Sequence, residues 1–192
     1  MCLNISYLKD IRVVAFDLGG VLAYCDDSTL SEDELYLLQF YKKYMGRQIV
    51  SKKDRDFLEY AKSKMSGIYL KIHKLNNDTI PVLEMLQDEK IRTSIWTNNT
   101  PYINSWLEEV ELTRFIHSGD IINSFYLGYD KPDIRFYLEA LRILNINPLS
   151  VLFLDDNSIN VESALRCGIW GEQYTMQMSL YNKVKDIIRI RK

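Results

Sequence analysis

The sequence is poor in cysteine, has no strong excess of either charge and contains no long apolar run. Its three cysteines are odd in number and widely spaced, so they indicate neither a disulfide framework nor a metal-ligand pattern. A reducing compartment fits this usage, and we expect a cytoplasmic protein. No apolar run is long enough to cross a bilayer, and the first residues lack the basic and apolar regions of a signal peptide.

The charges of the chain nearly cancel. Its 192 residues carry 24 Lys and Arg against 26 Asp and Glu, which gives a formal net charge of −2. Nothing in that balance directs the protein toward nucleic acid or an acidic membrane, and we expect neither as a partner. Hydrophobic residues make up 47% of the chain, enough for a sizeable core. The length suggests one domain with room for an inserted subdomain, and the oligomeric state is left open.

Strand and helix patterns alternate over most of the chain. Apolar runs typical of strands occupy residues 11–18, 91–96, 115–118 and 151–154, and a last short strand begins at Ile169. Helical patterns separate them at 79–86, 101–110, 132–144 and 158–166, and another ends the chain. The stripe of the third of these helices is predicted to be Ile134, Leu138, Leu141 and Leu144. This alternation predicts an α/β fold with a doubly wound parallel sheet.

One block differs from the rest. Residues 25–77 contain no proline, are rich in Lys, Glu, Tyr and Leu, and have helical spacing. Ser31 and Ser51 are each placed to cap the start of a helix. We therefore predict a core made of residues 1–24 and 78–192, with 25–77 inserted as a helical subdomain.

Polar side chains that carry chemistry recur where the strands end. They are Asp17, Thr97, Asn98, Lys131, Asp155 and Asp156. In a parallel α/β sheet, ligands bind beyond the carboxyl ends of the strands, so fold logic brings these residues to one site. An Asp that attacks phosphorus, a hydroxyl, a lysine and a second carboxylate group suit phosphoryl transfer. Carboxylates that share a site need a cation between them, and Mg²⁺ is the cation that suits such oxygen ligands.

Four motifs connect these residues to a known family. Phe-Asp-Leu-Gly-Gly-Val-Leu, Trp-Thr-Asn-Asn, Asp-Lys-Pro-Asp and Leu-Asp-Asp-Asn-Ser-Ile-Asn follow one another along the chain. In order and spacing they resemble the four motifs of the haloacid dehalogenase (HAD) superfamily, over nearly the whole chain. The chain is similar to a subgroup of phosphatases with a helical cap after the first motif, which includes a glucose-1-phosphate phosphatase and the phosphatase domain of soluble epoxide hydrolase. The resemblance implies a Rossmann-like HAD core and a helical cap at 25–77.

The resemblance also implies an activity and its residues. Asp17 would be the nucleophile, and Thr97 with Asn98 beside it would hold the phosphate. Lys131 would neutralise both nucleophile and phosphate. The implied activity is Mg²⁺-dependent hydrolysis of small phosphorylated metabolites, sugar phosphates among them, through an aspartyl-phosphate.

The same resemblance implies a Mg²⁺ site. Asp17, Asp156 and the backbone carbonyl of Gly19 would bind the ion directly. Asp155 would support the site from behind, and Asn160, one helical turn further on, would do the same.

Gly19 departs from the family pattern. The family usually has a second Asp at this position, which protonates the leaving group, and its loss removes a contribution of roughly 10²–10⁴-fold. The alternative function is therefore a non-catalytic Mg²⁺ and phosphate binder.

Each motif taken singly also has a simpler interpretation. Thr97-Asn98 could be a helix cap, Lys131 a solvated loop residue, and Asp155-Asp156 a cap for the helix that follows. A phosphoryl-receiver domain has its acidic pair after the first strand, which does not fit this order of motifs. A metal-free dehalogenase does not need the late acidic pair, and a phosphonatase needs a Schiff-base lysine that does not stand out in residues 25–77.

Overall fold

The computed structural model describes residues 11–44 and 51–189, which form two compact units. The first, which we call the core unit, comprises residues 11–24, 75–101 and 111–189. The second, which we call the helical unit, comprises residues 25–44, 51–74 and 102–110. Each unit is described by itself.

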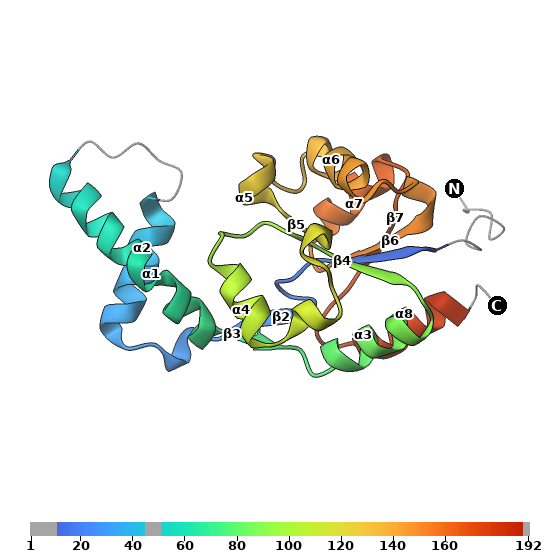
Figure 1. The fold of residues 1–192 in the computed structure, drawn as a ribbon, viewed down its shortest axis with the longest axis horizontal. Helices are drawn as coiled ribbons and strands as arrows, with labels where there is room; N and C mark the ends of the chain where they lie inside the picture. The colour runs from blue at the N-terminus through green and yellow to red at the C-terminus, as the bar shows by residue number, and fades with distance from the viewer. Residues whose placement is uncertain (1–10, 45–50, 190–192) are drawn as a thin grey trace. The chain divides into compact units, whose positions relative to one another are not determined.

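A five-stranded parallel sheet organises the core unit (Figure 1). Its strands run in the order β5-β4-β1-β6-β7. They are β1 (Val13–Phe16), β4 (Arg92–Thr97), β5 (Ile121–Asn123), β6 (Val151–Asp155) and β7 (Trp170–Gln173). Chain order moves outward from β1 to one edge of the sheet and then returns to the other side of β1. The prediction of a doubly wound parallel sheet is confirmed.

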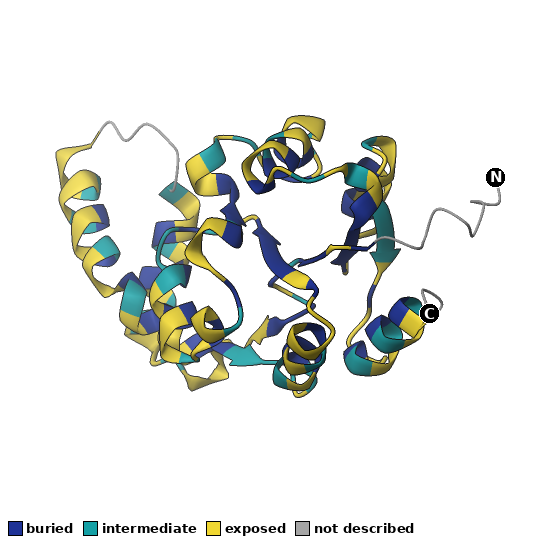
Figure 2. Cartoon of the chain, turned by 45° about the vertical axis from the view of Figure 1, so that its right-hand side comes forward, coloured by how far each residue is buried: buried dark blue, intermediate teal, exposed yellow. Residues whose placement is uncertain are grey.

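Strand β1 lies at the centre of this sheet because it is apolar on both faces. All four of its residues are buried (Figure 2). Val13 pairs with Arg92 on one side and with Val151 on the other, and the same register continues to Phe16. Strands buried on both faces are typical of sheets covered by helices on each side.

Five helices belong to the core unit. They are α3 (Thr79–Asp88), α5 (Ser124–Leu127), α6 (Ile134–Leu144), α7 (Ser158–Arg166) and α8 (Leu180–Arg189). Figure 1 shows α5, α6 and α7 on one side of the sheet and α3 with α8 on the other. Trp96, Tyr137 and Phe153 meet in the layer between the sheet and α6, with ring centroids 5.2–6.1 Å apart. None of the described helices is both long and apolar enough to cross a membrane.

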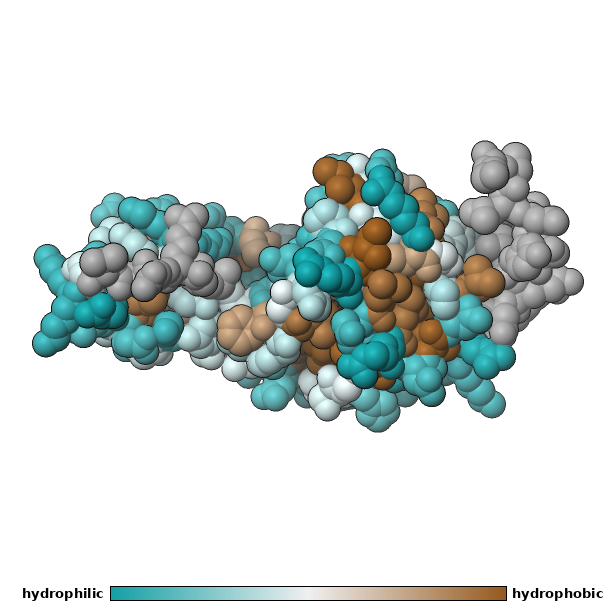
Figure 3. Space-filling view, turned by 90° about the horizontal axis from the view of Figure 1, so that it is seen from above, coloured by the Kyte–Doolittle hydropathy of each residue, from teal (hydrophilic) through white to brown (hydrophobic). Residues whose placement is uncertain are grey.

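The buried face of α6 differs from the predicted stripe. Leu141 and Leu144 are buried as predicted, but Ile134 is 42% and Leu138 53% exposed. The side chains that pack inward instead are Phe136, Tyr137 and Ala140. In Figure 3, which looks onto the α5–α7 side, brown side chains gather on the core unit. The aromatic pair fills the space against the sheet, so the helix turns its smaller aliphatic residues outward.

The strand predicted at 115–118 is wrong. The structure has short 3-10 turns at Leu112–Arg114 and Ser118–Asp120, and strand β5 begins only at Ile121. The carboxylate of Asp120 is buried and receives two hydrogen bonds from Arg92. A three-residue strand carries too little periodicity to be located from sequence.

Helices α1 (Glu32–Tyr44), α2 (Lys52–Ile72) and α4 (Ile103–Glu109) make up the helical unit. The Ser51 hydroxyl accepts from the Asp54 N–H, as expected of a cap, at 3.4 Å. The sequence division placed 101–110 in the core, whereas the structure groups 102–110 with the helical unit. Trp106 is responsible, because its buried indole packs near His73 and donates to the His73 carbonyl at 3.0 Å.

Two short strands stand where the chain passes between the units. They are β2 (Ala23–Cys25) and β3 (His73–Leu75), and they pair in a two-stranded sheet of their own. The Asn76 N–H donates to the Leu22 carbonyl at 2.9 Å, which ties the returning chain to the core unit. Sequence analysis did not predict this pair, because each strand has only three residues.

Candidate active site

The candidate site lies at the carboxyl edge of the core sheet, where the strand order reverses. Asp17 directly follows β1, Thr97 is the last residue of β4, and Asp155 is the last residue of β6. Asp156 follows it. Three adjacent strands thus deliver their polar ends to the place where α/β proteins bind ligands.

Lys131 is the centre of the charge arrangement. Its Nζ lies 2.9 Å from Asp17 Oδ1 and 2.7 Å from Asp155 Oδ2. The side chain of Lys131 is only 1% exposed, and that of Asp155 is fully buried. Buried charges are costly unless they are paired, and this ammonium pairs with two carboxylates at once. Lys131 is therefore no solvated loop residue.

Asn98 holds the backbone of Lys131. Its Oδ1 accepts from the Lys131 N–H and its Nδ2 donates to the Lys131 carbonyl, both at 2.8 Å. The helix that follows, α4, begins only at Ile103 with Tyr102 at its N-cap position. Thr97 and Asn98 are thus not a helix cap.

Asp155 is held from several directions. The Asn160 Nδ2 lies 3.0 Å from its Oδ1 and 3.1 Å from its Oδ2, and the Asn157 N–H donates to Oδ1 at 2.9 Å. Helix α7 is capped by Asn157, whose side chain accepts from the Ile159 N–H. The cap interpretation of Asp155-Asp156 is therefore wrong, because the next residue performs that function. The Tyr137 hydroxyl donates to the Asn160 carbonyl at 2.8 Å and fixes the start of this helix.

A cation fits among the three carboxylates. One oxygen each of Asp17, Asp155 and Asp156 lies within 4.8 Å of the others. These acids face the single ammonium of Lys131, which leaves two negative charges unbalanced, the charge that a divalent ion supplies. Among the residues that the structure describes, the buried Asn160 Oδ1 has no hydrogen-bond partner, so an acceptor is available beside the acidic cluster. Hard oxygen donors of this kind suit Mg²⁺.

Burial and mutual repulsion act on the carboxyl groups of this cluster. Burial raises the pKa of Asp17 to about 6 against the opposing effect of Lys131, and Asp155 adds to the rise. Burial also raises the pKa of Asp156, again with a contribution from Asp155. Carboxylates that repel one another in this way favour a bound cation.

Two neighbouring glycines differ in the room around them. A Cβ added at Gly19 would meet no atom within 4 Å. At Gly20, where φ is +77°, a Cβ would lie 2.2 Å from Asp156 Oδ2. Gly20 is not among the site residues expected from the sequence, although a double glycine directly after a strand signals close backbone approach. Gln173, whose Nε2 donates to the Asp156 carbonyl at 2.9 Å, is not among them either.

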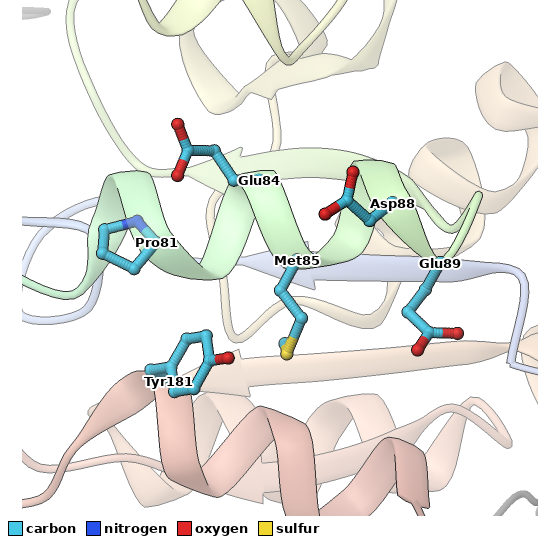
Figure 4. Close-up of a pocket in the computed structure, with 6 residues that line it drawn as sticks. All are labelled: Pro81, Glu84, Met85, Asp88, Glu89 and Tyr181. Carbon is cyan, nitrogen blue, oxygen red and sulfur yellow. The ribbon is translucent and has the colours of Figure 1, made fainter.

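A groove of about 440 Å³ between α3 and α8 is separate from this cluster (Figure 4). It is lined by Pro81, Glu84, Met85, Asp88, Glu89 and Tyr181. Three of these side chains are acidic, so the groove is unsuited to a phosphate group, and the carboxyl edge stays the candidate site.

Comparisons with known proteins agree with this fold. A family model described as haloacid dehalogenase-like hydrolase matches residues 16–170. Flavin mononucleotide hydrolase 1 of Arabidopsis thaliana is 27% identical over 134 residues, which cover 69% of this chain and 52% of that protein. The chain therefore spans about half the length of this curated relative.

Solved structures share the fold. A HAD family enzyme of Bacteroides thetaiotaomicron in its magnesium complex has a TM-score of 0.68 at 18% identity, covering 92% of this chain and 100% of that one. The same enzyme with magnesium and inorganic phosphate has a TM-score of 0.64 at 17% identity, covering 88% and 96%. Because the family model matches residues 16–170, most of the length of this chain, the chain belongs to the haloacid dehalogenase-like hydrolases.

Proposed function

We propose that this hydrolase is a Mg²⁺-dependent phosphatase of small phosphorylated metabolites. The observation that carries the proposal is the Lys131 ammonium held between the carboxylates of Asp17 and Asp155. A buried lysine beside a carboxylate that is 14% exposed places a positive charge where a phosphate must approach a nucleophile. The magnesium and phosphate complex of the Bacteroides enzyme and the name of the Arabidopsis relative support the same class of reaction.

Each residue then has a definite task. Asp17 forms a bond from its carboxylate oxygen to phosphorus while the bond from phosphorus to the leaving oxygen breaks. The leaving oxygen takes a proton from water, because Gly19 offers no acidic side chain. Water then hydrolyses the aspartyl-phosphate, which restores the carboxylate. Thr97 and the backbone N–H of Asn98 hold the phosphate, and Lys131 balances the negative charge of phosphate and nucleophile.

The metal ligands follow from the acidic cluster. Asp17, Asp156 and the Gly19 carbonyl hold Mg²⁺, while Asp155 and Asn160 orient these groups. When bound, the ion supplies charge neutralisation at the phosphate oxygens. We assign to the helical unit, which contains most of the predicted 25–77 insertion, the role of a cap that selects the substrate. A cytoplasmic location stays a prediction from the cysteine usage.

The test is a phosphate-release assay over sugar phosphates, nucleotides, flavin mononucleotide and an aryl phosphate, with Mg²⁺ and with a chelator. We expect turnover with Mg²⁺ only, and a loss of at least about 10³-fold in Asp17→Asn, as for other covalent nucleophiles. Asp88→Asn, the same change at an exposed position of α3, serves as the matched control. More than a tenth of the activity left in Asp17→Asn would rule out the nucleophile.

A further inference from the structure

The side chain of Asn98 binds the backbone of Lys131. Its amide meets both backbone groups of Lys131, a residue 33 positions away, with two hydrogen bonds of 2.8 Å. One amide that accepts from an N–H and donates to the carbonyl of the same residue reproduces the pairing of two strands. It therefore fixes both the position and the direction of that backbone.

Lys131 needs such an anchor. It lies in the loop between α5, which ends at Leu127, and α6, which begins at Ile134, so no helix or strand holds its backbone. Its long side chain must nevertheless place Nζ within 2.9 Å of Asp17 and 2.7 Å of Asp155. A flexible lysine held at its backbone loses less freedom when it forms these contacts.

We propose that Asn98 is a positioning residue that acts through Lys131, setting where the ammonium lies relative to the nucleophile. The inference rests on the proposed function and adds to it a residue that governs the charge at the site. It differs from the expectation that Asn98 simply holds phosphate, because the polar atoms of its side chain are already bonded to the Lys131 backbone.

The chemistry of asparagine is specific here. Aspartate has the same size and keeps the acceptor for the Lys131 N–H, but it turns an oxygen toward the Lys131 carbonyl and adds a fourth carboxylate to the site. Alanine keeps neither hydrogen bond. Both substitutions leave the backbone N–H of residue 98 in place, so they isolate what the side chain does.

A double-mutant cycle tests the proposal. The variants are Asn98→Ala, Lys131→Met and the double variant, assayed on 4-nitrophenyl phosphate with Mg²⁺. We expect Asn98→Ala to lower kcat about tenfold or more, with KM changed by less than about threefold. In the Lys131→Met background the same change should cost less than about twofold, because residues that act as one unit are not additive. An equal fold-loss in both backgrounds would overturn the proposal.

Controls separate positioning from folding. Asn147→Ala removes an asparagine that only accepts from the Leu149 N–H in its own turn, and we expect its kcat to be unchanged. Asn98→Asp is the second variant if Asn98→Ala does not fold, and its cycle with Lys131→Met should show the same lack of additivity. A full multiplication of losses in that cycle would also overturn the proposal.

A failure of the proposed function is distinguishable from a failure of this inference. If wild type and Asp17→Asn release phosphate equally slowly, the proposed function is wrong. The cycle is then measured as the urea midpoint of unfolding. Asn98→Ala should lower that midpoint more in wild type than in Lys131→Met, because only wild type has an ammonium to hold. Equal shifts in the two backgrounds would refute the positioning role.

Discussion

A methyl group added at Gly20 should weaken the proposed metal site much more than it destabilises the fold. Its φ is +77°, a conformation that costs an L-residue about 1–2 kcal/mol. A Cβ there would lie 2.2 Å from Asp156 Oδ2 and 2.6 Å from Cγ, so the carboxylate must move. Because Asp156 is an exposed residue, its carboxylate can turn toward solvent, and the stability cost should stay near that of the backbone alone. The larger effect should fall on the metal.

We expect Gly20→Ala to weaken Mg²⁺ binding about tenfold or more, the equivalent of about 1.4 kcal/mol, and to lower the free energy of unfolding by about 1–2 kcal/mol. Calorimetric Mg²⁺ titration and urea unfolding measure the two effects. Gly168→Ala is the matched control, because its φ is +79° and its Cβ would make only ordinary contacts, at 3.7 Å and beyond. It should lose similar stability and no Mg²⁺ affinity. Unchanged Mg²⁺ affinity in Gly20→Ala would refute the assignment of Asp156 as a ligand.

Two further predictions concern proton transfer and pH. Gly19 has no acidic side chain to protonate the leaving group, and the space around it is open. Hydrolysis of aryl phosphates should therefore slow steeply as the leaving group becomes more basic, whereas Gly19→Asp should flatten that dependence. A flat series of kcat/KM values in wild type would contradict this. If wild type is inert on the whole panel and Gly19→Asp is active, the non-catalytic alternative is correct. Burial lowers the pKa of His73. As the pH drops below about 6.5, the unfolded chain therefore binds a proton at this histidine that the folded chain does not bind. The free energy of unfolding should fall over the same range. His73→Gln should reduce this fall in urea titrations; a fall of unchanged size in that variant would count against the burial argument.

The sequence predicts those helices and strands whose signals are local. The apolar run before Asp17 and the run before Asp155 each identify a strand from a few adjacent residues, and both are strands in the structure. Helix α7 was predicted with the bounds that it has, Ser158–Arg166. Where the signal was weak, the prediction failed, as at 115–118 and at the exposed Ile134 and Leu138 of α6.

The fold class, the family and the polar residues at the strand ends can be predicted from the sequence, because they follow from periodicity and from motifs of a few residues. The contacts between these residues are visible only once the chain is folded. The contact of Lys131 with Asp17 and Asp155, the grip of Asn98 on the Lys131 backbone and the closeness of Gly20 to Asp156 all join distant parts of the chain. Such contacts depend on how strands and loops pack in space, and no local pattern of residues encodes that.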